Sequence, residues 1–270
     1  MSLRPDHTGV AIVTGAAGGM GSAAAARLAA EGRSLILCDV DAGRLQHCAE
    51  ALPPNGQPVH VLAGDLSDPA YLDRLLESLG GRLVDALIHT AGLSPTMGDA
   101  GRMFAINYDA TARLVDALRP RMAPGGCAVL IASSSGYLMK SAEIDAALDM
   151  LTPGQDMTQL LKIAPDPGRA YTLSKRAVIR LVARQAAAFG AQGARIVSIS
   201  PGLIDTAMTR AEMKASRQMD SMLAKTPLRR LGLADEIASV AVFLCSPGAS
   251  YVSGCDIPVD GGMLAAMHML

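Results

Sequence analysis

The chain has 270 residues, of which 50% are apolar and 18% are charged, and its formal net charge of −1 excludes the basic balance typical of proteins that bind nucleic acid or anionic membranes. Its five cysteines are widely spaced and lack a CxxC pair, which argues against a disulfide framework or a metal site and for reduced thiols. No apolar run is long enough to cross a membrane, and no basic-then-apolar leader opens the chain, so we expect a cytoplasmic protein.

Short, almost continuously apolar runs alternate along the chain with helical stretches rich in alanine and leucine. The runs lie at 9–15, 34–40, 59–66, 84–92, 127–134, 194–200 and 255–260. The helical stretches include 21–32, 69–80, 102–119, 172–190 and 234–245. Runs of this kind are typical of parallel strands covered on both faces. The alternation predicts an α/β fold, a Rossmann-type doubly wound parallel sheet of about seven strands with helices on both faces. No linker interrupts it, so we expect one domain over residues 1–270.

Glycines follow the first run in the sequence "TGAAGGMG", at Gly15, Gly19 and Gly21, and a helical stretch begins directly after them. Glycines in a strand–turn–helix context allow a tight turn and let the backbone approach a pyrophosphate at the helix N-terminus. A plain tight turn is the alternative explanation for a glycine cluster taken alone. The context favours a dinucleotide site.

Asp39 ends the second run, 18 residues after Gly21. A carboxylate here can accept hydrogen bonds from the adenosine ribose and repels a 2′-phosphate, which favours NAD over NADP. Arg44 follows too late to be expected at such a phosphate, and we interpret it as a surface charge. A strand-end cap is the alternative role for Asp39.

Two segments depart from the alternation. In 138–169, apolar residues recur at helical spacing on both sides of a "TPG" turn, which predicts an inserted helical hairpin. The segment 203–226 carries four methionines in a polar background and suits a mobile cover over a substrate site.

Further motifs follow in a fixed order: "GDL" at 64–66, "HTAG" at 89–92, Asn107, Ser133, "YTLSK" at 171–175 and "SPG" at 200–202. With the glycine loop, this ordered set resembles the short-chain dehydrogenase/reductase family over about residues 8–262. The first two residues of "HTAG" depart from the two asparagines usual in the family. That puts a sheet-bracing role in doubt, and we interpret His89 as a packed strand residue, neither ligand nor base.

The resemblance implies that Tyr171 exchanges a proton with the substrate oxygen. A free phenol has a pKa of about 10, too high for catalysis near neutral pH. Lys175, four residues later on the same helix face, is expected to lower it. At an effective dielectric of about 20, a cation ~4 Å away supplies roughly 4 kcal/mol, which lowers the pKa by about 3. The resemblance also assigns Lys175 to the nicotinamide ribose.

Two polar residues complete the implied catalytic set. Ser133, three residues before Gly136, matches the family serine that hydrogen-bonds the substrate oxygen, with Ser134 as the alternative. Asn107 matches the asparagine that holds a water between Lys175 and solvent, with a structural cap as the alternative.

Further positions match cofactor contacts of the family. In the glycine loop these include Ala17 and Met20. Elsewhere they are Asp65, Leu66, Ala91, Gly92, Pro201, Gly202, Ile204 and Thr206. Together with the glycines, Asp39, Tyr171 and Lys175 they imply NAD as the cofactor, and no metal is expected.

The long insertion between Ser133 and Tyr171, with "ASYVSGCDIPVDGG" near the C-terminus, looks most like the bacterial 3α-hydroxysteroid dehydrogenase/carbonyl reductase branch. Two apolar walls beside the tyrosine suggest a bulky hydrophobic alcohol or ketone, such as a steroid, terpenoid or aromatic. An oligomer contact is the alternative role of the insertion, and we expect a homodimer or a homotetramer.

Competing functions remain open at this point. A diol dehydrogenase and a 3-oxoacyl reductase belong to the same family, although reductive roles favour NADP. A non-catalytic dinucleotide sensor typically lacks the tyrosine or the lysine, and both are present here. An epimerase would need a further substrate domain. The favoured reading is an NAD-dependent secondary-alcohol dehydrogenase.

Overall fold

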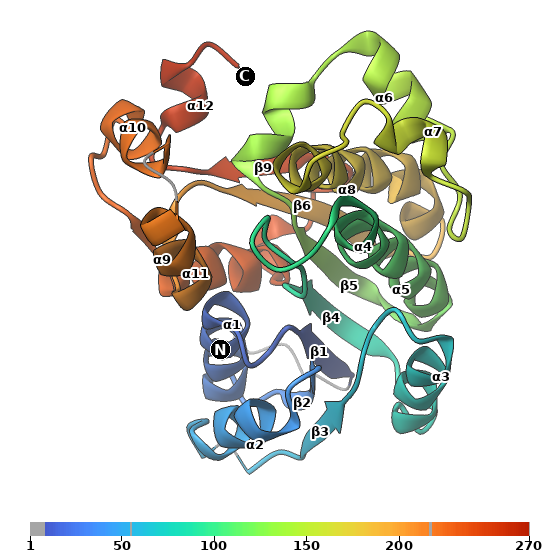
Figure 1. Ribbon diagram of the computed structural model, residues 1–270. Helices are drawn as coiled ribbons and strands as arrows, with labels where there is room; N and C mark the ends of the chain where they lie inside the picture. Colours follow the sequence, from blue (N-terminus) through green and yellow to red (C-terminus); the bar gives the residue numbers. More distant parts are fainter. Residues whose placement is uncertain (1–8, 55, 216–217, 270) are drawn as a thin grey trace.

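A computed structural model describes residues 9–54, 56–215 and 218–269 (Figure 1). Its main sheet has seven strands in the order β3-β2-β1-β4-β5-β6-β9, and every neighbouring pair is parallel. The strands are β1 Val10–Thr14, β2 Ser34–Asp39, β3 Val59–Ala63, β4 Val84–His89, β5 Met122–Ile131, β6 Arg195–Pro201 and β9 Asp256–Val259. A separate short pair is formed by β7 Ile204–Asp205 and β8 Gly232–Leu233. The predicted single-domain, doubly wound sheet is confirmed.

The helices follow the strands along the chain. They are α1 Gly19–Ala30, α2 Ala42–Glu50, α3 Pro69–Ser78, α4 Ala100–Phe104, α5 Thr111–Leu118, α6 Ala142–Asp149, α7 Thr158–Leu161, α8 Pro167–Gly190, α9 Ala207–Ala215, α10 Gln218–Lys225, α11 Ala234–Leu244 and α12 Met263–Ala266. One π-helical turn, η1 Ala105–Ala110, joins α4 to α5, and three 3-10 turns lie at η2 Arg119–Arg121, η3 Ser134–Met139 and η4 Pro247–Ala249. No helix within the described ranges has both the length and the apolarity to cross a membrane.

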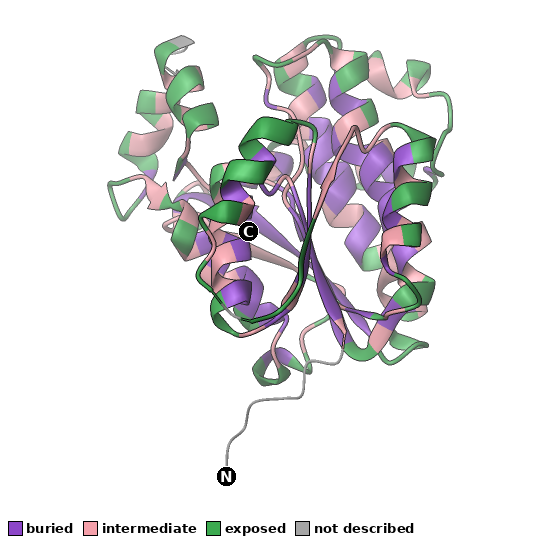
Figure 2. Ribbon diagram, turned by 90° about the horizontal axis from the view of Figure 1, so that it is seen from below, coloured by how far each residue is buried: buried purple, intermediate pink, exposed green. Residues whose placement is uncertain are grey.

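Two apolar cores hold the three layers together, one on each face of the sheet. One core joins the sheet to α3, α4, α5 and α8, and the other joins it to α1, α2 and α11. Figure 2 shows the buried strands edge-on between these helix layers. Burial on both faces explains the continuous apolar runs, because successive side chains of a strand point alternately into one core and the other.

Helix α2 is the clearest omission from the predicted helices. Asp41 caps it by accepting a hydrogen bond from the Arg44 backbone N–H at 3.0 Å. Aspartate at the N-cap is a recognisable start signal. The helix buries only Leu45 and Cys48, so its apolar pattern is too sparse to reveal it.

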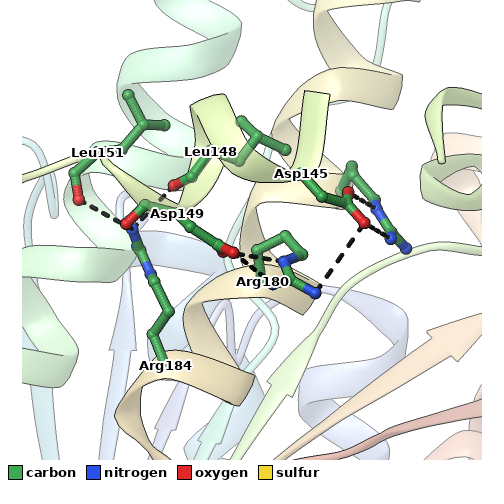
Figure 3. Close-up of polar contacts among 7 residues, drawn as sticks. Asp145, Leu148, Asp149, Leu151, Arg180 and Arg184 are labelled. Carbon is green, nitrogen blue, oxygen red and sulfur yellow. Dashed lines mark hydrogen bonds and ion pairs between the residues drawn. The ribbon is translucent and has the colours of Figure 1, made fainter. Parts of the chain in front are cut away.

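The insertion 138–169 folds as α6 and α7, and α6 lies along α8 (Figure 3). Three arginines of α8, spaced four residues apart, bind it: Arg176 pairs with Asp145, and Arg180 with Asp149. Arg184 donates to three backbone carbonyls at the end of α6, those of Leu148, Asp149 and Leu151, at 2.8, 2.7 and 3.0 Å. We call this set the arginine ladder.

The apolar side of the insertion packs inward. Leu148, Leu151 and Ala164 are buried in the core beneath α8. These residues therefore belong to the monomer's own core rather than to an exposed contact face. The predicted cover, 203–226, forms β7, α9 and α10, and Figure 1 draws both helices beyond the ends of β6 and β9. Residues 216 and 217 of that segment lie outside the described residues.

Candidate active site

The glycine loop connects β1 to α1 at the carboxyl end of the sheet. Gly15 has a φ of +68°, which disfavours other residues there. A Cβ on Gly21 would lie 2.2 Å from the Gly15 carbonyl oxygen, and one on Gly15 would lie 2.7 Å from the Ala91 nitrogen. Only glycines allow this packing, and it leaves the loop backbone at the start of α1 free of side chains that would obstruct a pyrophosphate.

Asp39 lies at the end of β2 beside this loop. Its Oδ2 accepts a hydrogen bond from the Ala17 backbone N–H at 3.0 Å, and its Oδ1 accepts one from Asp41 N–H at 3.1 Å. The strand-end cap is therefore real. A carboxylate has about four acceptor sites, so these two bonds leave capacity for ribose hydroxyls.

Arg44 is exposed, as expected of a surface charge, but it also contacts the glycine loop. Its Nη2 donates to the Ala17 carbonyl oxygen at 2.8 Å, which places the guanidinium against the glycine loop. The cause is the position of Arg44 in the first turn of α2, which the Asp41 cap directs toward that loop. Arg44 and Ala17 also line a cavity of about 470 Å³ between α1 and α2. The Asp39 carboxylate and the Arg44 guanidinium thus both contact the glycine loop at Ala17.

Asn107 occupies the π-helical turn and clamps the segment after β4. Its Oδ1 accepts from Leu93 N–H at 2.7 Å, while its Nδ2 donates to Leu93 O at 3.0 Å and to Ser174 Oγ at 3.2 Å. A Cβ on Gly92 would lie 3.0 Å from Asn107 Oδ1 and 3.5 Å from Lys175 Nζ. The geometry matches the structural alternative for Asn107, and its water-holding role stays a prediction.

The predicted proton-transfer residues converge where β5 meets α8. Ser133 directly follows the end of β5, and its hydroxyl lies close enough to Tyr171 to act to lower the pKa of the phenol. Ser133 is half-buried, whereas Ser134 is buried at 4% exposure, so Ser133 is the serine presented beside the phenol. The Oγ of Ser133 also accepts from Ser135 Oγ at 3.0 Å.

Lys175 is directed at the sheet rather than at the phenol. Its Nζ donates to the Ile131 carbonyl oxygen at 2.9 Å and lies 5.8 Å from the centre of the Tyr171 ring. Burial lowers the pKa of Lys175 to about 8. Burial also raises the pKa of Tyr171 to about 12, against the lowering influence of the Ser133 hydroxyl and with the added repulsion of Glu212. The expected lowering of the Tyr171 pKa is wrong for this arrangement, because burial of the phenol has the largest effect and the Lys175 ammonium is turned toward Ile131.

The other predicted cofactor positions surround the same edge of the sheet. Asp65 accepts from Ser67 N–H at 2.8 Å and turns the chain after β3. Leu66 packs on the core, and Ala17 and Met20 pack on the opposite one. Gly202 follows Pro201 at the end of β6.

Thr206, in the segment that follows β6, contacts the glycine loop at Gly19. Its Cγ2 lies 3.2 Å from where a Cβ on Gly19 would be, and Ile204 is buried just before it. The backbone around Gly202 is equally close, since a Cβ there would lie 2.8 Å from Asp260 Cα. The glycine loop, the 90–92 segment and the 201–206 segment thus form a cradle that glycines keep open, and the residues fit a dinucleotide. Within the described residues, no group of three or more histidine, cysteine or acidic side chains is placed to hold a metal ion.

His89 braces the sheet, a role that sequence reasoning had placed in doubt. One ring nitrogen hydrogen-bonds Thr14 Oγ1 of β1 at 2.7 Å, and the other hydrogen-bonds Thr111 Oγ1 of α5 at 2.7 Å. The side chain is 3% exposed. Burial, assisted by the Lys175 charge, lowers the pKa of His89 from 6.5 to about 3.

We expect His89 to make stability depend on pH. Its pKa is depressed in the folded state, so its contribution is complete above 6.5 and is lost as the pH falls from 6.5 toward 3. Between pH 7.5 and 5.5 the free energy of unfolding should fall by about 1.4 kcal/mol through this group alone. Urea unfolding of wild type and His89→Asn at both values measures it. Equal pH slopes in the two proteins would contradict the assignment.

Comparison with known proteins gives matches along almost the whole chain. Residues 9–145 match the family described as short chain dehydrogenase, and residues 156–264 match the family described as Enoyl-(Acyl carrier protein) reductase. The chain is 31% identical to 3-alpha-hydroxysteroid dehydrogenase/carbonyl reductase of Comamonas testosteroni, over 96% of this chain and 98% of that protein. It is 30% identical to meso-2,3-butanediol dehydrogenase of Serratia marcescens, over 95% of each.

A solved structure resembles the fold closely. It is the 3-alpha-hydroxysteroid dehydrogenase from Pseudomonas sp. B-0831 complexed with NADH, with a TM-score of 0.78 and 28% identity over 96% of this chain and 98% of that one.

Proposed function

The chain belongs to the short-chain dehydrogenase/reductase family, and from that premise we propose that it is an NAD-dependent oxidoreductase that interconverts a secondary alcohol and a ketone. The observation that carries the proposal is the convergence of Ser133, Tyr171 and Lys175 beside the glycine loop. A nicotinamide dinucleotide supplies the hydride acceptor or donor when bound.

The residues divide the remaining work. Ser133 positions the substrate oxygen, since its half-buried hydroxyl lies near the phenol and influences its pKa. Tyr171 transfers the proton: its raised pKa keeps it protonated near neutral pH, ready to donate to a ketone oxygen. Alcohol oxidation needs the phenolate, so we expect its rate to rise with pH. Lys175 holds the nicotinamide ribose from the buried end of the site.

The preference for NAD rests on Asp39. Its carboxylate faces the loop where an adenosine ribose is held in this fold, and a 2′-phosphate there would meet like charge. Arg44 opposes this effect from the other side of Ala17, so we propose a preference rather than an exclusion.

For the substrate we propose a bulky, largely hydrophobic alcohol or ketone, such as a steroid, terpenoid or aromatic compound. The support is the methionine-bearing helices α9 and α10, which follow β6 and β7 in the chain, and the likeness to hydroxysteroid dehydrogenases. The likeness to meso-2,3-butanediol dehydrogenase favours a second candidate, a diol. A cytoplasmic location and an assembly of two or four copies complete the proposal.

Steady-state oxidation of a panel of steroid, terpene, aryl and diol secondary alcohols tests the function. NAD and NADP are supplied in parallel, the pH is varied from 7 to 10, and reduced nicotinamide is read by absorbance. We expect turnover of bulky alcohols with NAD, faster at higher pH because burial holds the Tyr171 pKa at about 12. Tight NAD binding without turnover of any member would instead favour a dinucleotide sensor.

A further inference from the structure

Glu212 lies on α9, the helix that follows β7 and Thr206. Its side chain is half-buried, and its Oε1 is shielded from solvent yet has no hydrogen-bond partner among the described residues. Arg210, a neighbouring cation on the helix, is already paired with Asp205. Lys214, on the other side in sequence, is exposed.

Glu212 lies in the neighbourhood of Tyr171. Helix α9 is fixed at its start by Thr206, which packs against Gly19 of the glycine loop. From there, Glu212 lies close enough to Tyr171 for its charge to raise the pKa of the phenol. The other polar groups near the phenol are Ser133, which follows β5, and Lys175 of α8, whose ammonium is bound to the Ile131 carbonyl oxygen and lies 5.8 Å from the centre of the Tyr171 ring. Glu212 is therefore a shielded acceptor near the phenol, and its effect on the pKa of the phenol opposes that of Ser133.

An unpaired carboxylate oxygen shielded from water is costly, and the cost is removed when a donor reaches it. A wall built only to hold an apolar substrate would have no use for such a group. A substrate that brings its own hydroxyl or ammonium gains a charge-assisted hydrogen bond, and an analogue without that group leaves the carboxylate unpaired. The enzyme should therefore have a higher kcat/KM for substrates that carry this donor group than for analogues that lack it.

We propose that Glu212 is a specificity-determining residue that accepts a hydrogen bond from a second donor group of the substrate, a hydroxyl or an ammonium, placed away from the reacting carbon. This inference rests on the proposed function and narrows its substrate class. The substrate is a secondary alcohol or ketone whose body carries a further donor, such as a dihydroxysteroid, a cyclic diol or an amino alcohol.

Matched pairs of substrates provide the test: cyclohexane-1,2-diol with cyclohexanol, a dihydroxysteroid with its monohydroxy counterpart, and 2-aminocyclohexanol as the ammonium arm. The measured quantity is the ratio of kcat/KM for the member with the second donor to that for the member without it. In Glu212→Leu we expect this ratio to fall by about 10- to 100-fold, the loss expected for one hydrogen bond to a charged group. The mono-alcohol should gain, because no unpaired carboxylate then faces it.

Two further variants serve as controls. One distinguishes a hydroxyl from an ammonium donor, and the other tests for a nonspecific effect of altering α9. Glu212→Gln keeps an acceptor oxygen without the charge, so it should retain most of the diol preference and lose that for the amino alcohol. Lys214→Gln, an exposed charge change on the same helix, should keep the wild-type ratios. In both Glu212 variants the acid limb of the pH profile of kcat/KM for oxidation should move to lower pH, because a negative charge near the phenol is gone.

The inference is overturned if the ratios in Glu212→Leu equal those of the wild type. Turnover of mono-alcohols with NAD would then still support the proposed function. If the wild type turns over no member of any pair, the proposed function fails and this inference fails with it.

Discussion

Tyr171→Phe is expected to reduce kcat/KM by about 100- to 10 000-fold, the range over which a positioned acid or base contributes to catalysis. The substitution removes one oxygen from a half-buried ring and leaves the glycine loop, Asp39 and Lys175 in place. Affinity for NAD should therefore stay within a few-fold of the wild type. Steady-state kinetics and fluorescence titration of NAD measure the two quantities separately.

A matched substitution controls for the loss of a phenol near the site. Tyr137 of η3 donates to Asp256 Oδ2 at 2.9 Å, and the structure gives it no part in proton transfer. Tyr137→Phe should keep kcat within a few-fold of the wild type. Losses of similar size in turnover and in NAD affinity for Tyr171→Phe would contradict a role confined to proton transfer.

Replacing Asp39 should produce the largest change in cofactor use. Asp39→Asn keeps an acceptor for the Ala17 N–H but loses the charge that repels a 2′-phosphate. We expect the NAD-to-NADP ratio of kcat/KM to fall by about 10- to 100-fold, because one charge-assisted hydrogen bond and one repulsion change together. Asp39→Ala should lower it similarly and also weaken the loop, since the Ala17 N–H then loses its partner.

The double variant with Arg44→Ala tests the opposing cation. If the guanidinium at Ala17 O assists a 2′-phosphate, Arg44→Ala in the Asp39→Asn background should restore part of the NAD preference. Initial rates with both cofactors at saturating alcohol give the ratios. An unchanged ratio in Asp39→Asn would remove the argument from the ribose.

Much of the architecture could be predicted from the sequence, because a parallel sheet with two buried faces produces continuous apolar runs that alternate with helices. The glycine loop and Asp39 were equally accessible, since their functions depend on local spacing. The family and the fold predicted from the ordered motifs are confirmed. The roles of the site residues stay predictions that the variants above address.

What the sequence could not supply depends on contacts between distant segments. His89 meets Thr14 from 75 residues away and Thr111 from 22 residues away, so its bracing role is invisible in either motif. Lys175 was expected to face the phenol from helical spacing alone, but the Ile131 carbonyl competes for its ammonium. Glu212 belongs to no motif and stands out only because its oxygen is shielded.

The arginine ladder has a consequence for redesign. Arg176 directly follows Lys175. The same turn of α8 therefore carries a predicted catalytic residue and the first arginine that pairs with the insertion, through Asp145. Deleting part of residues 138–169 to widen the substrate site would leave three guanidinium groups without their hydrogen-bond acceptors. It would also destabilise α8, the helix that positions Tyr171. Engineers seeking new substrates should leave this segment intact and diversify α9 and α10, which the arginine ladder does not touch.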